Sequence, residues 1–273
     1  MKNKFFKVLC AALAFSVIFE LFAPMSVEAK SEKSASGSET VGAEQTIMQP
    51  VYVGQTNTLI LITKDGVAKP SKVKWKVTDG TGKVKISKKK HTYKGVKAGT
   101  VNITATYKKK SYDFVLEVLK KKSIKAQTVK VNDISLKIPA NYELIADTVF
   151  SNTKKEAGMI VNGEDLGVDV SDLTDSDWEE FDKILIGEFE AMDLSTFDLY
   201  GFGIDNSKIK REVKKLEHGV YAINFEYSVK NVGKYYYKMV SIVRGSSQKL
   251  AVFFALNEKN ITSDVEYFLK NNK

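Results

Sequence analysis

The stretch that decides the fold is KGVKAGTVNITATY, residues 94 to 107. Its first part is rich in glycine and predicts a turn over residues 94 to 99, whereas residues 100 to 107 alternate strictly in polarity. Val101, Ile103 and Ala105 share one face of the predicted strand, because successive side chains of a strand point to opposite sides. A strand with one apolar face needs a second sheet to cover it, so the stretch predicts a β-sandwich.

The same period of two continues on both sides of this stretch. Residues 73 to 77 alternate apolar side chains with lysines, and residues 112 to 118 alternate apolar with polar side chains. From Val51 to Leu119 the chain is therefore a series of short strands, as in an all-β sandwich. We interpret Trp75 as a core residue between the sheets; the alternative, a sugar-stacking platform, would need exposed aromatic neighbours in place of the flanking lysines.

The order of these signals resembles the bacterial immunoglobulin-like domain of group 2, over residues 47 to 119. After Trp75 on an early strand, the matching residues follow in order: Gly95, Val96, Ala98, Gly99, Thr100, Ile103 and Ala105. Residues 88 to 91, Lys-Lys-Lys-His, stand where that family usually has a turn of small residues. The resemblance implies an Ig-like spacer or adhesive module on an exported or surface protein, without catalysis.

The N-terminus predicts export. Three lysines precede an apolar run from Val8 to Phe22, and Val27 and Ala29 supply the small residues of a cleavage site, so residues 1 to 29 have the pattern of a signal peptide. The alternative is an uncleaved anchor, although an acidic residue and a proline interrupt the pattern. No second run of membrane length follows, so no transmembrane segment is expected after cleavage. The predicted location is secreted or associated with a bacterial cell surface.

Composition divides the remaining chain into four predicted parts. They are a disordered leader (residues 30 to 46), the Ig-like domain (47 to 119), a linker (120 to 128) and an α+β domain (129 to 273). The single cysteine, Cys10, lies in the predicted signal peptide, so no disulfide and no thiolate ligand are expected in the mature chain.

The α+β domain is predicted as an antiparallel sheet with two helices. A lead strand ends at Ile138, a hairpin is expected at Asn162-Gly163, and Ser176 with Glu179 predicts a capping box at the start of a helix. A three-stranded meander and a helix over residues 263 to 271 follow.

This order of elements resembles the PsbP/Mog1-like α+β sandwich. Ile138, Pro139 and Tyr142 match its opening motif. The resemblance implies a binding or assembly factor that has no catalysis of its own.

Charge is distributed unevenly. Residues 64 to 122 contain eighteen lysines and four acidic residues, a balance of +14, whereas residues 123 to 273 have a balance of −5. Three runs form the candidate polyanion-binding site: Lys88, Lys89, Lys90, Lys108, Lys109, Lys110, Lys120, Lys121 and Lys122. An exported basic module would meet an anionic wall polymer or glycan. The alternative is a solvated lysine surface that protects strand edges and binds nothing specifically.

Other kinds of site are not expected. The chain has only two arginines and no nucleic-acid-binding motif, which argues against sequence-specific binding of nucleic acid. Its two histidines, His91 and His218, fall in different predicted domains, so we expect no catalytic residues, no metal site and no cofactor. The acidic residues from Glu164 to Asp182 could form a solvated face, bind calcium without EF-hand spacing, or contact the basic domain.

The sequence therefore predicts an exported, non-enzymatic binding or adhesion protein, whose Ig-like module contacts an anionic wall polymer or glycan. The alternative is an Ig-like spacer that presents a C-terminal domain, which itself binds a peptide or small ligand. A third possibility is a C-terminal hydrolase, which would need two carboxylates in one cleft. The sequence does not identify a protein partner.

Overall fold

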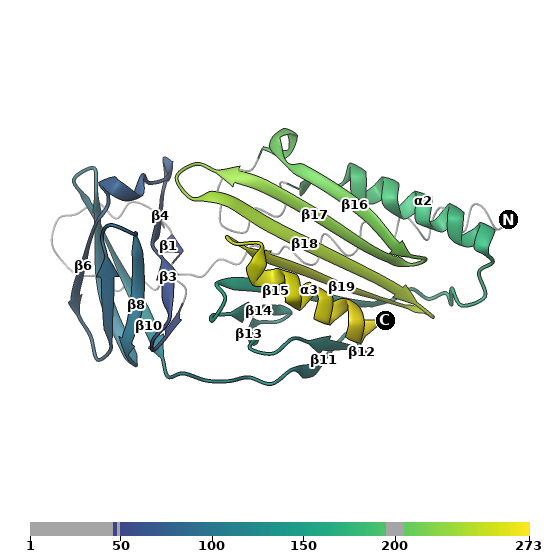
Figure 1. The fold of residues 1–273 in the computed structure, drawn as a ribbon, viewed down its shortest axis with the longest axis horizontal. Helices are drawn as coiled ribbons and strands as arrows, with labels where there is room; N and C mark the ends of the chain where they lie inside the picture. The colour runs from purple at the N-terminus through teal and green to yellow at the C-terminus, as the bar shows by residue number, and fades with distance from the viewer. Residues whose placement is uncertain (1–45, 48–49, 195–204) are drawn as a thin grey trace.

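The computed structural model describes residues 46–47, 50–194 and 205–273. The predicted signal peptide and nearly all of the predicted leader lie outside the described residues. Figure 1 shows two groups of strands, which we name the N-terminal region (residues 46–119) and the C-terminal region (residues 127–273). Residues 120 to 126, between them, form no helix or strand. The described chain is rich in strands and has two α-helices, as the sequence predicts.

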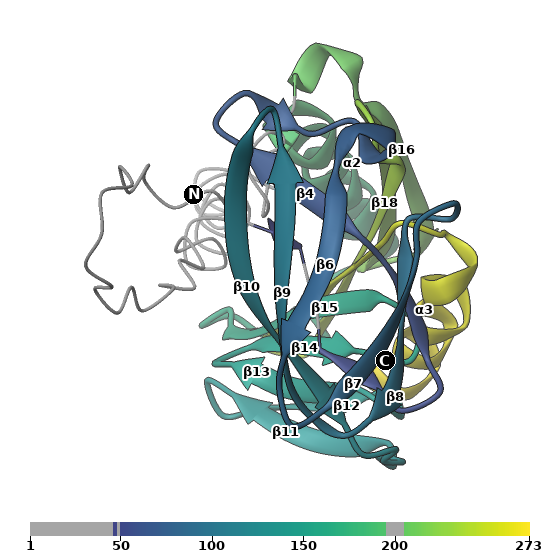
Figure 2. The same cartoon turned by 90° about the vertical axis from the view of Figure 1, so that its left-hand side faces the viewer.

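The N-terminal region contains three small sheets (Figure 2). The largest has the order β2-β10-β9-β6, with β2 (Val51–Tyr52), β6 (Lys74–Asp79), β9 (Gly99–Tyr107) and β10 (Lys110–Leu119). The second has the order β3-β8-β7, with β3 (Thr56–Thr58), β7 (Lys83–Ser87) and β8 (Thr92–Lys97). The third has the order β1-β4-β5, with β1 (Thr46–Ile47), β4 (Ile60–Thr63) and β5 (Gly66–Val67), and a 3-10 turn, η1 (Pro70–Lys72), leads to β6.

The inward face predicted for residues 100 to 107 is confirmed. Val101, Ile103 and Ala105 are buried in one core together with Trp75, whose ring lies 6.3 Å from that of Phe114. Trp75 is only 8% exposed, which matches its interpretation as a core residue. Burial of a large aromatic side chain stabilises a fold by about 1.5–3 kcal/mol, so this core accounts for the alternating pattern around it.

The turn predicted over residues 94 to 99 is wrong. Residues 94 to 97 belong to β8, and only Ala98 separates β8 from β9. A Cβ atom on Gly95 would come within 2.6 Å of the carbonyl oxygen of Tyr52, and Gly99 has a φ of +132°. The glycines are therefore needed for close approach of neighbouring backbone and for a bend, instead of a reversing turn.

The C-terminal region is built on one antiparallel sheet of seven strands, in the order β13-β14-β15-β19-β18-β17-β16. Its strands are β13 (Glu143–Ala146), β14 (Val149–Asn152), β15 (Ala157–Asp165), β16 (Lys210–Glu217), β17 (Val220–Val229), β18 (Gly233–Arg244) and β19 (Ser247–Ala255). The predicted meander corresponds to β17, β18 and β19. A 3-10 turn, η3 (Asn206–Lys208), precedes β16, an edge strand that was not predicted from the sequence.

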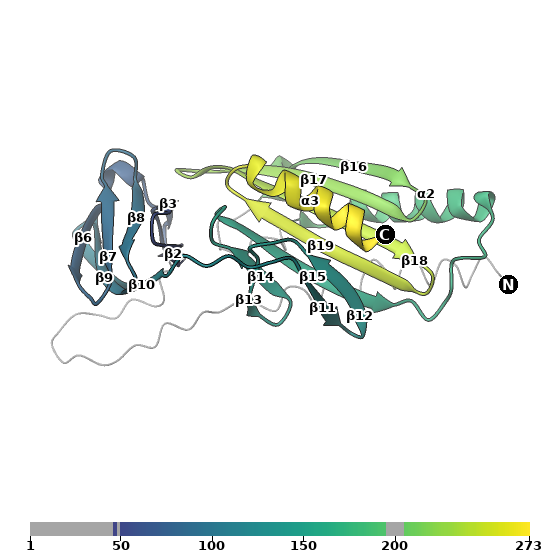
Figure 3. The same ribbon diagram turned by 60° about the horizontal axis from the view of Figure 1, so that its bottom comes forward.

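Two helices pack on opposite faces of this sheet (Figure 3). Helix α2 (Asp175–Ala191) buries Phe181 and Leu185 in one core, whereas α3 (Lys259–Asn272) buries Ile261 and Phe268 in another. The hairpin of β11 (Gln127–Val131) and β12 (Ile134–Ile138) packs beside α3. The described residues contain no helix that is long and apolar enough to cross a membrane.

The hairpin predicted at Asn162-Gly163 is wrong. Strand β15 runs through both residues without interruption. A Cβ atom at Gly163 would lie 2.6 Å from the Cβ of Ile134 and 2.8 Å from the carbonyl oxygen of Val131. The glycine lets the β11–β12 hairpin pack closely over β15, so its role is tertiary and not a turn.

The lead strand and the helix cap also differ from prediction. The lead segment is two strands, β11 and β12, joined by a turn. The capping box of α2 uses Thr174 and Asp177 instead of Ser176 and Glu179. The Asp177 amide donates to Thr174 Oγ1 over 3.3 Å, and the Thr174 amide donates to Asp177 Oδ2 over 3.1 Å. The same reciprocal motif therefore acts two residues earlier than predicted.

Candidate functional site

The β7–β8 hairpin carries the most concentrated positive charge of the N-terminal region. Between Asp79 and Asp113 the sequence contains ten lysines and no acidic residue. On β7, Val84 and Ile86 pack against the core, so the alternate residues Lys83 and Lys85 lie on the outer face. This alternation separates an apolar inner face from a basic outer face.

The strand register places lysine opposite lysine. Lys83 pairs with Lys97 and Lys85 pairs with Lys94 across β7 and β8, and all four side chains are exposed. Residues directly opposite in an antiparallel pair have Cβ atoms about 4.5–5.5 Å apart, and like charges there are destabilising. None of the four has an ion pair within the described residues. We name Lys83, Lys85, Lys94 and Lys97 the lysine face.

The three predicted lysine runs do not form one patch. Lys88 to Lys90 lie in the turn between β7 and β8, directly beyond the lysine face. Lys108 and Lys109 form the turn between β9 and β10, and Lys110 is the first residue of β10, whereas Lys120 to Lys122 follow its end. Strand β10 separates the last two runs by about 30 Å, at roughly 3.3 Å per residue. All nine lysines are exposed, and Lys122 is paired with Glu143 over 3.1 Å.

The outer face of the other sheet is different in charge. Its central strand, β9, presents Thr104 and Thr106, with Lys74 and Lys76 on one neighbouring strand and Asp113 on the other. Thr104 donates to Asp113 over 2.6 Å. Because this face carries charges of both signs, it should attract a polyanion less strongly than the lysine face does.

The β9–β10 turn is strained by its sequence. Lys108 and Lys109 have φ values of +47° and +67°, and they form a two-residue turn closed by the pair Tyr107 and Lys110. Turns of this geometry strongly favour Asn-Gly, because most other residues are strained at positive φ.

Replacing Lys108 with asparagine and Lys109 with glycine should therefore raise the Tm of the N-terminal region by about 5 °C. Calorimetry would measure this change, with Lys120→Asn/Lys121→Gly as the control of equal charge change outside a hairpin turn. We expect relief of strain to outweigh loss of the exposed Lys108–Asp65 ion pair, and an unchanged or lower Tm in the first variant would contradict this expectation.

A buried polar cluster in the C-terminal region was not predicted. The carboxylate of Asp182 on α2 is 4% exposed, and it accepts hydrogen bonds from Tyr221 Oη over 2.5 Å and from Lys215 Nζ over 2.9 Å. His218 Nδ1 lies 2.6 Å from Asp182 Oδ2, and the Gly219 amide donates over 3.3 Å. Burial acts to raise the pKa of Asp182, but these hydrogen bonds outweigh it and hold the pKa below its usual value.

This cluster fixes α2 to the sheet. Trp178 of α2 also lies over the His218 ring, with the centroids 5.8 Å apart. The sequence suggested an isolated histidine, whereas the fold brings His218 beside a carboxylate 36 residues away. The arrangement anchors the helix, because donors from β16, β17 and the turn between them all bind one carboxylate of α2. Without these hydrogen bonds the buried carboxylate would be costly to bury.

Three of the acidic residues around α2 serve local turns or the helix cap: Asp165, Asp169 and Asp177. Asp165 and Asp169 accept backbone amide hydrogen bonds from Gly167 and Ser171, over 2.9 and 2.8 Å. In the part of the chain that the structure describes, no group of three or more His, Cys, Asp or Glu side chains could hold a metal ion.

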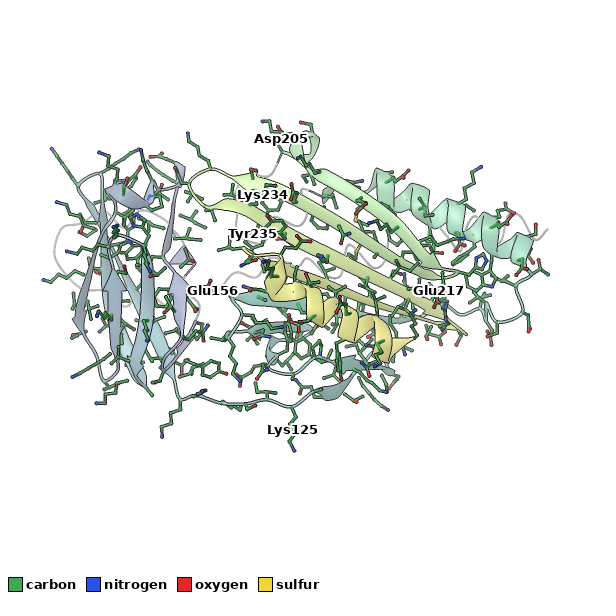
Figure 4. All side chains as sticks on the ribbon, in the orientation of Figure 1. Lys125, Glu156, Asp205, Glu217, Lys234 and Tyr235 are labelled. Atoms are coloured by element: carbon green, nitrogen blue, oxygen red, sulfur yellow. The ribbon has the colours of Figure 1, made fainter. Side chains whose placement is uncertain are left out.

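Acidic residues outside this cluster contact the N-terminal region. The Thr58 amide donates to Glu156 Oε1 over 2.6 Å, and Tyr52 Oη donates to Glu143 Oε2 over 3.5 Å. Figure 4 shows Glu156 and Tyr235 on the side of the C-terminal region that faces the N-terminal region. Burial raises the pKa of Glu156, although the Thr58 amide partly offsets this shift.

Comparisons with known proteins find little. No family model matches the chain, and no curated protein matches it. A solved structure of the Ran-binding protein Mog1p from Saccharomyces cerevisiae is a weak structural neighbour. It is 12% identical, and the match covers 53% of this chain and 84% of that chain, with a TM-score of 0.29.

A TM-score this low does not establish a shared fold. The neighbour therefore bears on neither the PsbP/Mog1-like resemblance nor the group 2 immunoglobulin-like resemblance. Both resemblances therefore remain predictions.

Proposed function

We propose that the chain is an exported, non-enzymatic binding or adhesion protein of the bacterial cell surface, which contacts an anionic wall polymer or glycan through its lysine face. The observation that carries this proposal is the pairing of Lys83 with Lys97 and Lys85 with Lys94 across one hairpin. Paired lysines repel each other in the free protein, and a polyanion that lies over them would replace repulsion with attraction.

The two regions have different proposed roles, and these roles follow the predicted domains. We propose an Ig-like sandwich of group 2 for residues 47 to 119 and a PsbP/Mog1-like α+β domain for residues 129 to 273. The last two residues of the linker predicted for residues 120 to 128 belong to β11 (Gln127–Val131), so the proposed linker is residues 120 to 126. The core around Trp75 supports the first assignment, and the order of lead hairpin, α2, meander and α3 supports the second. In this proposal the N-terminal region supplies the polymer contact.

Binding through exposed lysines has a clear physical signature. An ammonium group is a compact charge that attracts phosphate or carboxylate without demanding a fixed geometry. Affinity should fall as salt rises, because salt screens charges that remain accessible to solvent. Polymers of different backbone but similar charge spacing should bind with similar affinity.

Two of the predicted runs provide a matched test of location. The variant K88Q/K89Q/K90Q removes charge beside the lysine face, and K120Q/K121Q/K122Q removes the same charge beyond the end of β10. We expect the first variant to bind purified poly(glycerol phosphate) about 100-fold more weakly than the second, since each of its three lysines near an anionic surface contributes about 1 kcal/mol. Isothermal titration calorimetry would measure both affinities. Equal losses would place the contact elsewhere or show a response to net charge alone.

A further inference from the structure

A separate cavity of about 480 Å³ lies where three turns meet. The turn between β4 and β5, the turn between β9 and β10 and the turn between β17 and β18 form its walls, so it is shared by the N-terminal and C-terminal regions. The residues that matter here are Asp65, Lys69, Tyr107, Lys108, Lys230 and Asn231. Its volume falls within the range of about 300–1,000 Å³ that small-molecule sites occupy.

The charges that line this cavity are unbalanced. Lys108 Nζ lies 3.1 Å from Asp65 Oδ2, and this pair holds the pKa of Asp65 below its usual value. Lys69 and Lys230 line the same cavity, and neither has an ion pair within the described residues. Two cations, one from each region, are therefore left to attract an anion.

The walls also offer groups for an uncharged part of a ligand. Val67 and Val229 supply apolar surface, and Thr63 and Tyr107 supply hydroxyl-bearing side chains. Asn231 Nδ2 donates to the Val67 carbonyl oxygen over 2.7 Å, which ties the β17–β18 turn to the N-terminal region at the cavity. A few polar groups among apolar walls are typical of sites that orient a small molecule.

The strained β9–β10 turn is a further feature of this cavity that is typical of a ligand site. Lys108 is held at a positive φ, where asparagine would be less strained, and the residue lines the cavity. Strained residues concentrate at ligand sites, where the strain is compensated by function.

We propose that this cavity binds a small organic phosphate, with Lys69 and Lys230 neutralising the phosphate. The lysine face is on a different hairpin, so this site and the polymer contact use different residues. A ligand bound here touches both regions, and it should stabilise their association.

The test uses the predicted mature chain and two probes, glycerol 3-phosphate and glucose 6-phosphate. We expect saturable binding with one site per chain, and we expect K69Q/K230Q to weaken it by tenfold or more. The matched control, K72Q/K259Q, removes one exposed lysine from each region away from the cavity and should bind as the unmodified chain does. Circular dichroism would confirm that both variants are folded.

Three results would overturn the proposal. They are no saturable binding of either probe, an equal loss in K69Q/K230Q and in the control, and inorganic phosphate binding as tightly as the organic phosphates. Displacement of glucose 6-phosphate by poly(glycerol phosphate) would identify polymer units as the source of the ligand, whereas binding without such displacement would identify a free organic phosphate. The K69Q/K230Q variant should still bind the polymer through the lysine face. Loss of phosphate binding in this variant would therefore test the cavity alone and not the proposed polymer contact.

Discussion

Replacing Asp182 with alanine should lower the free energy of unfolding of the C-terminal region by about 3 kcal/mol. The substitution leaves the buried hydroxyl of Tyr221 and the Gly219 amide without their acceptor, and it removes the anion beside Lys215 and His218. Lys215 and His218 are partly exposed and can be hydrated after the substitution. The expected loss of stability is therefore at the lower end of the range measured when one partner of a buried ion pair is removed. Urea denaturation would measure the difference.

The same cluster predicts a pH dependence of stability. The pKa of Asp182 is lower in the folded chain than its ordinary value, so the folded state favours the ionised carboxylate. Its contribution is fully present above the unfolded pKa, about 3.9, and is lost as pH falls through the lower folded pKa. In D182A this acid-dependent loss should be smaller.

The variant D182N tests whether the negative charge of Asp182 contributes to stability, because asparagine has nearly the same shape as aspartate but is neutral. Asparagine keeps one oxygen that can accept from Tyr221, but it is neutral beside Lys215, so we expect a loss of stability between those of the unmodified chain and D182A. A D182A variant as stable as the unmodified chain would contradict the interpretation of this cluster as the anchor of α2.

Neutralising the lysine face should affect binding and stability in opposite directions. The variant K83Q/K85Q/K94Q/K97Q should bind poly(glycerol phosphate) about 1,000-fold more weakly, since four lysines each contribute about 1 kcal/mol at an anionic surface. The same variant should be at least as stable as the unmodified chain, because two like-charged pairs across β7 and β8 are removed. Calorimetry would give the affinity, and thermal denaturation would give the Tm.

The control for this experiment is K74Q/K76Q/K125Q/K130Q, which removes the same charge from exposed positions on β6, the connecting segment and β11. We expect it to lose less than tenfold in affinity, through the reduced net charge alone. Similar losses in both variants, or a marked fall in Tm for the lysine-face variant, would argue for the alternative in which the lysines are a non-specific solvated surface.

Local patterns predicted the parts of the fold that depend on which side chains are buried. The alternation in residues 100 to 107 correctly gave the inward face, and the lysines around Trp75 correctly argued for a core tryptophan. The meander was also predicted, because β17 alternates, β18 and β19 are rich in apolar residues, and glycines mark the turns between the three strands.

Glycine misled the prediction at two places, because its role there depends on segments distant in sequence. Gly95 accommodates the backbone of β2, and Gly163 accommodates the β11–β12 hairpin. In a single sequence, a glycine needed for tertiary packing looks the same as one needed for a turn. The strands around both were therefore broken in the wrong place.

The candidate site could be predicted only in part for a similar reason. Contiguous lysine runs are visible in the sequence, but the lysine face depends on the register of β7 and β8, which includes an irregularity between Lys83 and Val84. Asp182 and the residues that bind it are separated by 33 to 39 positions, so no local spacing reveals them. The charge of the region was predictable, whereas its arrangement required the fold.

The most direct test of the proposed function is the salt dependence of affinity for poly(glycerol phosphate), compared between the unmodified predicted mature chain and its K83Q/K85Q/K94Q/K97Q variant. Between roughly 50 and 200 mM salt, the affinity of the unmodified chain should fall steeply, and that of the variant should be low and change much less. Saturable binding that is insensitive to salt, or an identical salt dependence in both proteins, would contradict a polyanion contact at the lysine face.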